Sequence, residues 1–297
     1  MHLQNAGKTD LRFPKMIEYL EYKPNQSLQK YIDCYWTLET TAEDINPEYE
    51  ERVIPLGFPE IIIHFGDLYT LKKNSKYYPL PRTLFTGQLT SSKSFKPLGI
   101  TGILGVKFKP FGAYYFLPEP PQKYVDRSTD LRQIFEPKTI NLLECGILKS
   151  KLHLEKIKLI ENFLLNHFQN FSTNIQIENI VTTIVTQKGN IDIKSLSSQF
   201  NSSQSKLERN FKKIIGLTPK KFAQIIRFNE ILKEYKSNKD LQSLAHKYEY
   251  YDYSHFTKEF SSFSGFSPNQ FKTVEKSLTE KLTIEENADF LHVKKDK

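Results

Sequence analysis

Hydrophobic residues follow two different spacings along this chain of 297 residues, and the change falls near residue 110. Before it, the apolar runs are short, β-branched or aromatic, and broken by Gly and Pro. They are "YIDCYWTLE" (31–39), "ERVIPLGFPEIIIHFGD" (51–67), "LFTGQLTSSKSF" (84–95) and "ITGILGVKF" (100–108). Such spacing is typical of strands. The run "EIIIH" (60–64), soon followed by a Gly-Asp turn signal, is too short and too β-branched for a helix and predicts a buried strand. Residues 30–110 are therefore expected to form an all-β sandwich or barrel.

After this region the periodicity becomes helical. A Pro-punctuated bridge, "KPFGAYYFLPEPPQKYVD" (109–126), leads into "LLECGILKSKLHLEKIKLIENFLLNHFQ" (142–169). The apolar residues of the second stretch form one amphipathic stripe, which we expect to pack either on the β domain of its own chain or on a second copy of that domain. The stripe consists of Leu152, Ile157, Ile160, Phe163, Leu164 and Phe168.

From residue 172 onward the pattern is helical throughout, and part of it occurs twice. "FKKIIGLTPKKF" (211–222) aligns with "FSSFSGFSPNQF" (260–271), with Phe, Gly, Pro and Phe in the same order. In each copy a short helix, a polar turn and a longer helix follow one another, and the longer helix has apolar residues at i, i+4 and i+7. This order is typical of a helix-turn-helix unit. The chain is thus expected to contain two such units.

The ends of the longer helices can be predicted from local signals. The first is expected to begin at Ser203 and to end at Gly216, and the second to run from near Tyr253 to Gly265, with each Gly in left-handed geometry. Thr218-Pro219 and Ser267-Pro268 then read as an N-cap followed by Pro at the first helical position.

Between the two units, "PKKFAQIIRFNEILKEYK" (219–236) predicts a connecting helix. Its length would be about 27 Å at 1.5 Å per residue. A rod of this length can hold two recognition helices about 34 Å apart, which is the distance between successive major grooves on one face of DNA.

Composition adds three constraints. The length suggests two domains, and no apolar stretch reaches the ~18 residues of a membrane span, so we expect a soluble, cytoplasmic protein. The net charge is +8, and residues 172–276 hold 16 Lys and Arg against 10 Asp and Glu, which weakly favours a polyanionic partner in that third of the chain. Cys34 and Cys145 are far apart and in no CxxC motif, so the sequence supports neither a disulfide framework nor a zinc site.

The longer helices also have a face that is not apolar. In the first it carries Ser205, Glu208, Arg209 and Lys212, and in the second Ser254, Thr257, Lys258 and Ser261. Small polar and basic side chains suit major-groove base edges and phosphates. Glu208 either accepts a hydrogen bond from cytosine or pairs with Lys212 at i+4, and we expect the pairing.

Residues 172–276 closely resemble the C-terminal DNA-binding domain of the AraC/XylS family of bacterial transcription regulators, most clearly in "YDYSHFTKEFSSFSGFSP" (251–268). The resemblance implies seven helices with two helix-turn-helix units, double-stranded promoter DNA as a partner, and contact with RNA polymerase. One departure is Glu249, where the family usually has Gly; left-handed geometry would cost a Glu on the order of 1–2 kcal/mol. Base-facing positions of the family fall on Ser205, Glu208, Arg209, Tyr253, Ser254 and Lys258, and backbone-contacting positions fall near Ser203, Lys206, Lys212, His255 and Thr257.

The N-terminal half resembles, less specifically, the β-rich sensor and dimerisation domains of such regulators. The residues that carry this resemblance are Trp36, "RVIPLGFPEI" (52–61) and "GVKFKPFGAYYFL" (105–117). It implies a small-molecule effector or a homodimer. Arg52 would then either bind an effector carboxylate or, as we expect, pair with an acidic neighbour such as Glu60.

Several other residues have a structural and a functional interpretation. His64 is taken as an ordinary strand histidine, since no HxH or carboxylate pair accompanies it, and we expect no metal and no cofactor. Tyr250 and Tyr251 are expected to close a turn and a small core, while Tyr253 is kept as a DNA contact. His255, on the second longer helix, is expected to contact phosphate rather than to serve a structural role.

The sequence therefore predicts an α+β protein of two domains. Residues 1–171 would form the β-rich sensor or dimerisation domain with its linker helices, 172–276 the all-α DNA-binding domain and 277–297 a tail. The expected function is a sequence-specific transcription regulator and not an enzyme. The alternatives are a DNA-binding domain fused to a repair-type enzyme, which needs a reactive Cys in an electropositive setting, or to a purely architectural domain.

Overall fold

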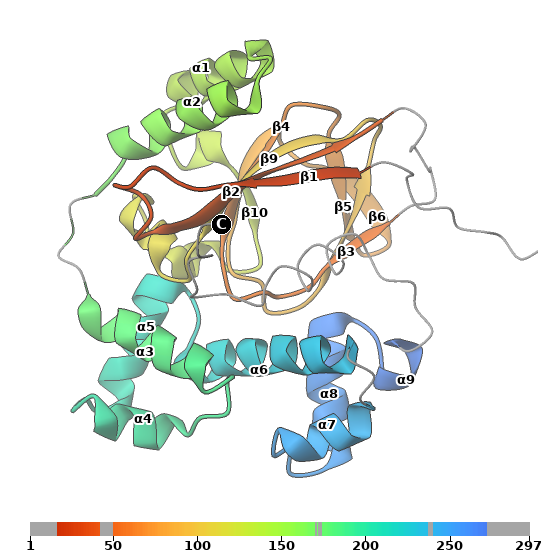
Figure 1. Cartoon of the computed structure of the whole chain (residues 1–297), viewed down its shortest axis with the longest axis vertical. Helices are drawn as coiled ribbons and strands as arrows, with labels where there is room; N and C mark the ends of the chain where they lie inside the picture. The colour runs from red at the N-terminus through yellow and green to blue at the C-terminus, as the bar shows by residue number, and fades with distance from the viewer. Residues whose placement is uncertain (1–16, 42–49, 170, 172–173, 237–239, 272–297) are drawn as a thin grey trace, which may run out of the picture.

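The computed structural model describes residues 17–41, 50–169, 171, 174–236 and 240–271. A β-rich part with two flanking helices lies above a helical part in the view of Figure 1. The observed architecture is therefore the expected α+β arrangement of an N-terminal β-rich part and a C-terminal helical part.

Ten strands form two separate sheets in the described part of the chain. Because the two sheets face each other without closing, the β-rich part is a sandwich and not a barrel. The first sheet has the order β1-β2-β9-β4-β7-β10, with bounds Ile17–Tyr22, Ile32–Thr40, Gly102–Phe108, Glu60–His64, Thr83–Thr86 and Ser128–Asp130. The second has the order β3-β8-β5-β6, with bounds Glu51–Val53, Lys93–Pro97, Tyr69–Lys73 and Lys76–Pro79.

Side chains of β4 point alternately to the two faces of the larger sheet. Ile61 and Ile63 are almost completely buried and belong to a core shared with the flanking helices. Glu60, Ile62 and His64 point to the opposite face, toward the smaller sheet. The predicted buried strand is confirmed, and its polar residues lie on the face that meets the second sheet.

Helices α1 (Pro137–Lys149) and α2 (His153–Asn166) cover the outer face of the larger sheet. The predicted stripe packs within its own chain: four of its members lie in this core and Phe168 packs against it. Leu152 is wrongly included, because it is the N-cap residue of α2 and its side chain is 62% exposed.

Four strands lie outside the predicted set: β1, β5, β6 and β10. The hairpin of β5 and β6 turns at Asn74 and Ser75, which both have positive φ, of 48° and 62°. Its flanking residues are Lys and Tyr rather than an alternating apolar series, so the usual strand signal is weak there.

The helical part contains seven α-helices among the described residues, as the family resemblance implies. They are α3 (Ile175–Thr186), α4 (Ile193–Gln199), α5 (Gln204–Ile215), α6 (Pro219–Lys236), α7 (Leu241–Lys247), α8 (Tyr253–Ser264) and α9 (Pro268–Phe271). In Figure 1, α6 joins the group α3–α5 at one end to the group α7–α9 at the other. The two longer helices, α5 and α8, and the connecting helix α6 have the bounds predicted from the sequence.

Local capping explains why these bounds were predictable. The Ser203 side chain caps α5 by accepting from the Lys206 N–H at 3.4 Å, and Gly216 ends the helix with φ 93°. Gly265 ends α8 with φ 75°. Each left-handed residue is followed by a Pro-initiated helix, α6 or α9.

The core of the helical part is not confined to it. Large buried residues of α5, α6 and α8, among them Phe211, Phe228 and Phe260, form one cluster. Ile54, Leu56 and Phe58, from the segment between β3 and β4, belong to the same cluster. The β-rich part and the helical part therefore share a continuous apolar core.

Candidate nucleic-acid interface and internal cavity

Helix α5 has one buried and one exposed face. Leu207, Phe211 and Ile214 are buried in the core of the helical part, because they repeat at i, i+4 and i+7. The opposite face is open to solvent. Its exposed candidates are Ser203, Ser205, Lys206, Arg209 and Lys212, while Glu208 is half-buried.

The position of Glu208 differs from the sequence-based expectation. Its Oε1 accepts a hydrogen bond from the Gln204 side chain at 3.1 Å, one turn toward the helix N-terminus. The expected pair with Lys212 is therefore wrong. Both neighbours lie four residues away on the same face, and the spacing alone does not distinguish them.

Helix α8 repeats this division into two faces. Phe256, Phe260 and Phe263 are buried, and the Asp252 side chain caps the helix by accepting from the His255 N–H at 2.6 Å. The exposed candidates are Tyr253, Ser254, His255 and Lys258, and Thr257 is half-buried.

The three tyrosines before and within α8 lie in different environments. Tyr250 packs against the core and donates a hydrogen bond to the Glu259 carboxylate at 2.5 Å. The Tyr251 side chain is 95% exposed at the turn that enters α8, which contradicts the expected small-core role. Tyr253 is 40% exposed. No local signal in the sequence distinguishes the exposed Tyr251 from the packed Tyr250.

A buried ion pair fixes α8 against α6. The Arg227 guanidinium donates to the Glu259 carboxylate at 2.8 Å, and the two side chains are 16% and 7% exposed. Gln224 donates to the same carboxylate at 2.7 Å, and the Arg227 guanidinium lies 4.2 Å from the Tyr250 ring centroid. The orientation of α8 therefore depends on one carboxylate with three donors.

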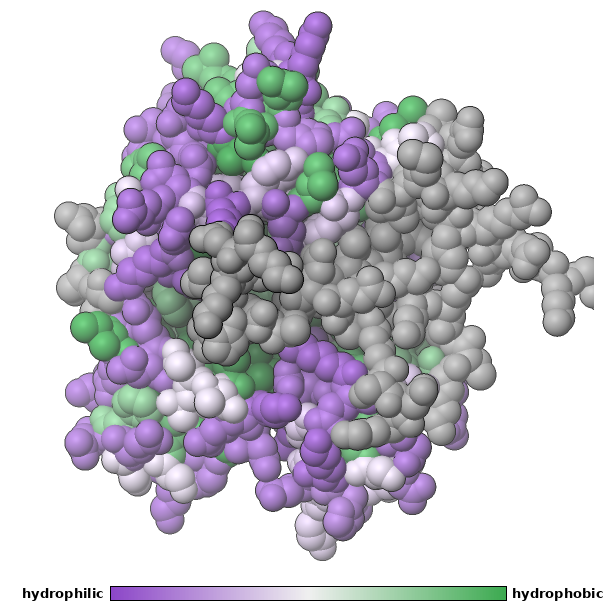
Figure 2. Space-filling view, viewed as in Figure 1, coloured by the Kyte–Doolittle hydropathy of each residue, from purple (hydrophilic) through white to green (hydrophobic). Residues whose placement is uncertain are grey.

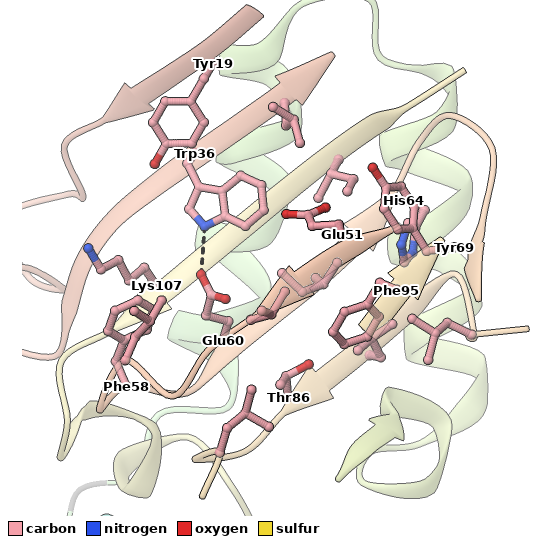
Figure 3. Close-up of a pocket in the computed structure, with 18 of the residues that line it drawn as sticks. Tyr19, Trp36, Glu51, Phe58, Glu60, His64, Tyr69, Thr86, Phe95 and Lys107 are labelled. Carbon is pink, nitrogen blue, oxygen red and sulfur yellow. Dashed lines mark hydrogen bonds between the residues drawn. The ribbon is translucent and has the colours of Figure 1, made fainter. Parts of the chain in front are cut away.

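A cavity of ≈ 160 Å³ lies between the two sheets. Every strand contributes lining residues to it except β6 and β10. Figure 3 shows aromatic rings and carboxylates projecting into this space from both sheets. The cavity therefore has mostly apolar walls with a small number of ionisable groups.

One glycine allows an indole and a carboxylate to meet across a strand. Trp36 on β2 pairs with Gly105 on β9, and Gly105 pairs in turn with Ile62 on β4. The Trp36 Nε1–H reaches past Gly105 and donates to Glu60 Oε1 at 2.9 Å (Figure 3). A Cβ at position 105 would lie 2.0 Å from the indole, so only Gly leaves room for this contact.

The ionisable groups of the cavity have shifted protonation equilibria. Burial raises the pKa of Glu60 to about 7, although the Trp36 hydrogen bond and the Lys107 charge act in the opposite direction. The Lys107 ammonium lies 3.0 Å from the Asp33 carboxylate and 4.7 Å from the Phe58 ring centroid. At neutral pH, Glu60 is thus close to its midpoint of ionisation.

His64 lines the same cavity. Its Nδ1 lies 3.1 Å from the carbonyl oxygen of Arg82, and burial lowers the pKa of the imidazole. Among the described residues, no group of three or more His, Cys, Asp or Glu side chains is arranged to hold a metal ion. His64 therefore acts as a hydrogen-bonded strand histidine.

The segment 51–58 contacts the cavity and the helical part at once. Arg52 Nη1 donates to the carbonyl oxygen of Gly265 at 3.4 Å, and its guanidinium lies 4.0 Å from the Phe266 ring centroid. Glu60 is bonded to Trp36 instead, so the expected pairing of Arg52 with Glu60 is wrong. Leu56 and Phe58 line the cavity and also lie in the core of the helical part.

Two further contacts strengthen this connection. The Asn229 side chain of α6 donates to the carbonyl oxygen of Pro55 at 3.1 Å. Gly57 has φ 86°, and a Cβ built there would lie 3.2 Å from Phe222 and 3.3 Å from Ile226, both of α6. Arg52, Pro55 and Gly57 of the "RVIPLGFPE" stretch thus contact the helical part, while Glu60 at its end lines the cavity.

The two cysteines lie in different settings, and that of Cys34 is not the setting of a reactive thiol. Cys34 is buried, and burial raises the pKa of its thiol, the opposite of what a nucleophilic cysteine requires. Cys145 is exposed on α1. No described helix is long and apolar enough to cross a membrane.

Two family models match the chain. One is described as "Helix-turn-helix domain" and matches residues 196–273, and the other as "Domain of unknown function (DUF6597)" and matches residues 20–130. No curated protein shows significant similarity to the chain.

Solved structures give distant matches. A structure of ToxT from Vibrio cholerae has 9% identity and a TM-score of 0.43, and the match covers 75% of this chain and 96% of that one. A structure of ToxT from the same organism with a bound unsaturated fatty acid has 12% identity and a TM-score of 0.37, over 86% and 94% of the two chains. The AraC-like transcriptional activator CuxR has 8% identity and a TM-score of 0.29, over 74% and 86%.

The paired helix-turn-helix units and the family model that spans both of them define a DNA-binding transcription regulator. More narrowly, the chain carries an AraC-type helix-turn-helix domain at its C-terminus and a DUF6597 domain before it.

Proposed function

We propose that this regulator recognises its promoter by inserting α5 and α8 into two successive major grooves of one DNA duplex. The observation that carries the proposal is the same division of faces on both helices, with an apolar stripe buried in the core and polar and basic side chains exposed. The proposed DNA contacts are Ser203, Ser205, Lys206, Glu208, Arg209, Lys212, Tyr253, Ser254, His255, Thr257 and Lys258. We add Tyr251, because its exposed ring lies at the entry to α8.

The length of α6 suits this mode of binding. Its 18 residues span about 27 Å at 1.5 Å per residue, and a recognition helix lies near each end. Successive major grooves on one face of B-DNA are about 34 Å apart. One chain can therefore supply the two helices that a helix-turn-helix dimer usually supplies.

We further propose that a small effector in the cavity controls DNA binding. Leu56 and Phe58 lie in both the cavity wall and the core of the helical part, and Arg52 caps the end of α8. A ligand that shifts these residues changes the packing of α6 and the position of α8. The effect of a bound ligand can therefore reach the helical part directly through these shared residues.

The remaining parts of the proposal concern organisation. Residues 1–171 form the sensor domain and 172–276 the DNA-binding domain, while the proposed tail 277–297 lies outside the described residues. Exposed leucines on α1, on α2 and at the α2 N-cap support a homodimer: Leu142, Leu148, Leu152 and Leu154 are each about half exposed or more. Figure 2 shows hydrophobic (green) surface near the top of the molecule, where α1 and α2 lie in Figure 1. We also propose a cytoplasmic location, contact with RNA polymerase and no enzymatic activity.

DNA binding by the full chain tests the groove assignment. A site is first selected from random DNA, and its affinity is then measured by fluorescence anisotropy over a range of salt concentrations. Arg209→Ala and Lys258→Ala are each expected to weaken binding by about tenfold or more. Where the lost contact is to a phosphate, the slope of log K against log salt concentration becomes shallower by about one.

Lys138→Ala is a matched control, because it removes the same charge from an exposed position on α1, far along the chain from either unit. It should leave affinity and salt slope unchanged. If Ala at both Arg209 and Lys258 also leaves them unchanged, the groove assignment is wrong. If selection returns no sequence motif, the chain is an architectural DNA binder instead.

A further inference from the structure

The size of the cavity suits a ligand with one small ring. Its volume is ≈ 160 Å³. An apolar protein cavity of about 150 Å³ accommodates one benzene molecule. A single six-membered ring with a short substituent therefore fits in this space.

The wall of the cavity is aromatic on several sides. Five Tyr, Trp and Phe rings line it, from both sheets and from the segment between β3 and β4: those of Tyr19, Trp36, Phe58, Tyr69 and Phe95 (Figure 3). Aromatic faces carry negative electrostatic potential and attract cations, with Trp the most effective. Such a lining suits an apolar ring and, next to it, a positively charged group.

The polar groups of the cavity wall also favour a positively charged ligand. Glu60 accepts one hydrogen bond, from Trp36 to Oε1, and among the described residues no donor bonds to Oε2. Glu21 and Glu51 also line the cavity. Lys107, the one basic residue in this lining besides His64, is paired with Asp33 at 3.0 Å.

These groups distinguish three kinds of ligand. An anion would meet Glu60 and two further glutamates, with Lys107 already paired. A neutral ring supplies no counter-charge to Glu60, so it gains no charge-assisted hydrogen bond from the carboxylate. A primary ammonium group donates to Glu60 Oε2 and keeps its remaining charge against the aromatic faces.

We infer that the cavity binds a small organic cation, a primary amine attached to a single apolar ring, with its nitrogen against Glu60 and its ring among the aromatic side chains. The inference rests on the proposed function, because it gives the chemical class of the effector. It also predicts how binding depends on pH.

Ligand binding requires ionised Glu60, and burial places the pKa of that group at about 7. Its ionised fraction in the unliganded protein rises from about one-tenth at pH 6 to about nine-tenths at pH 8, so affinity should rise by about tenfold over this range. The other ionisable groups that line the cavity with Glu60 are Tyr19, Glu21, Glu51, His64, Tyr69 and Lys107.

Isothermal titration calorimetry of the full chain without DNA tests the inference. The probes are benzylamine, benzyl alcohol and benzoate, which share the ring and differ in charge. Benzylamine should bind at least tenfold more tightly than benzyl alcohol, and benzoate should not bind. Glu60→Gln should weaken benzylamine binding by at least tenfold and remove the pH dependence, because Gln keeps an oxygen for the Trp36 N–H but carries no charge.

Glu18→Gln is the matched control, since Glu18 is an exposed neighbour of Tyr19 on β1 and should not affect binding. Equal binding of amine and alcohol, tighter binding of benzoate, or no binding of any probe at millimolar concentration each overturns the inference. If Glu60→Gln does not fold, the pH dependence of benzylamine binding to the wild-type chain tests the role of Glu60 instead. Because no DNA is present, these results are separate from the test of groove binding: benzylamine can bind while the groove assignment fails, and the reverse.

Discussion

Loss of the Glu259 carboxylate should destabilise the second helix-turn-helix unit more than any surface substitution. Three side chains donate to this carboxylate: Gln224 at 2.7 Å, Arg227 at 2.8 Å and Tyr250 at 2.5 Å. Glu259→Ala leaves the Arg227 guanidinium, which is 16% exposed, without its counter-ion. Breaking a buried pair from one side costs about 3–5 kcal/mol, a large share of the roughly 5–15 kcal/mol that stabilises a typical domain.

The assay is urea denaturation of the full chain followed by far-ultraviolet circular dichroism. Glu119→Ala is the control, because Glu119 and its partner Lys123 are both about half exposed and such pairs contribute at most about 1 kcal/mol. The double variant Arg227→Met, Glu259→Leu should recover most of the lost stability, since apolar replacement of both partners removes the unpaired charge. A loss below about 1 kcal/mol for Glu259→Ala would refute the reasoning.

Two further predictions concern a strained turn and a titrating acid. Glu249 has φ 55°, so Glu249→Gly should stabilise the chain by up to about 1 kcal/mol, and a lower denaturation midpoint would contradict this. The raised pKa of Glu60, about 7 against an ordinary 4.5, means that the folded chain keeps a proton which the unfolded chain has released. The stability of the wild type should therefore fall by up to about 3 kcal/mol between about pH 4.5 and 7. Glu60→Gln should abolish this part of the pH dependence, measured by denaturation at several pH values.

Features set by neighbouring residues in the sequence were the ones that could be predicted. The bounds of α5, α6 and α8 follow from capping side chains, left-handed glycines and helix-starting prolines, which all act within a few residues. The left-handed geometry of Glu249 was raised instead by the family resemblance, because the family usually has Gly there. In contrast, Glu208 has two neighbours at equal spacing, and only the side-chain conformations select Gln204 over Lys212.

Features that depend on distant pairing could not be predicted. The contact of Trp36 with Glu60 needs three strands in register and a glycine on the middle one. The contact of Arg52 with Gly265 joins residues 213 positions apart. Trp36 and Arg52 carry part of the resemblance of the N-terminal half, but no local rule predicts which residue each of them contacts.

The shared core around Ile54, Leu56 and Phe58 has a thermodynamic consequence. If the helical part were expressed alone, these three side chains would be missing from its core, and their contact surface on α6 would be exposed to water. The two parts should therefore melt in a single cooperative transition. By linkage, any molecule that stabilises the folded β-rich part also raises the melting temperature of the helices, even though it touches none of them.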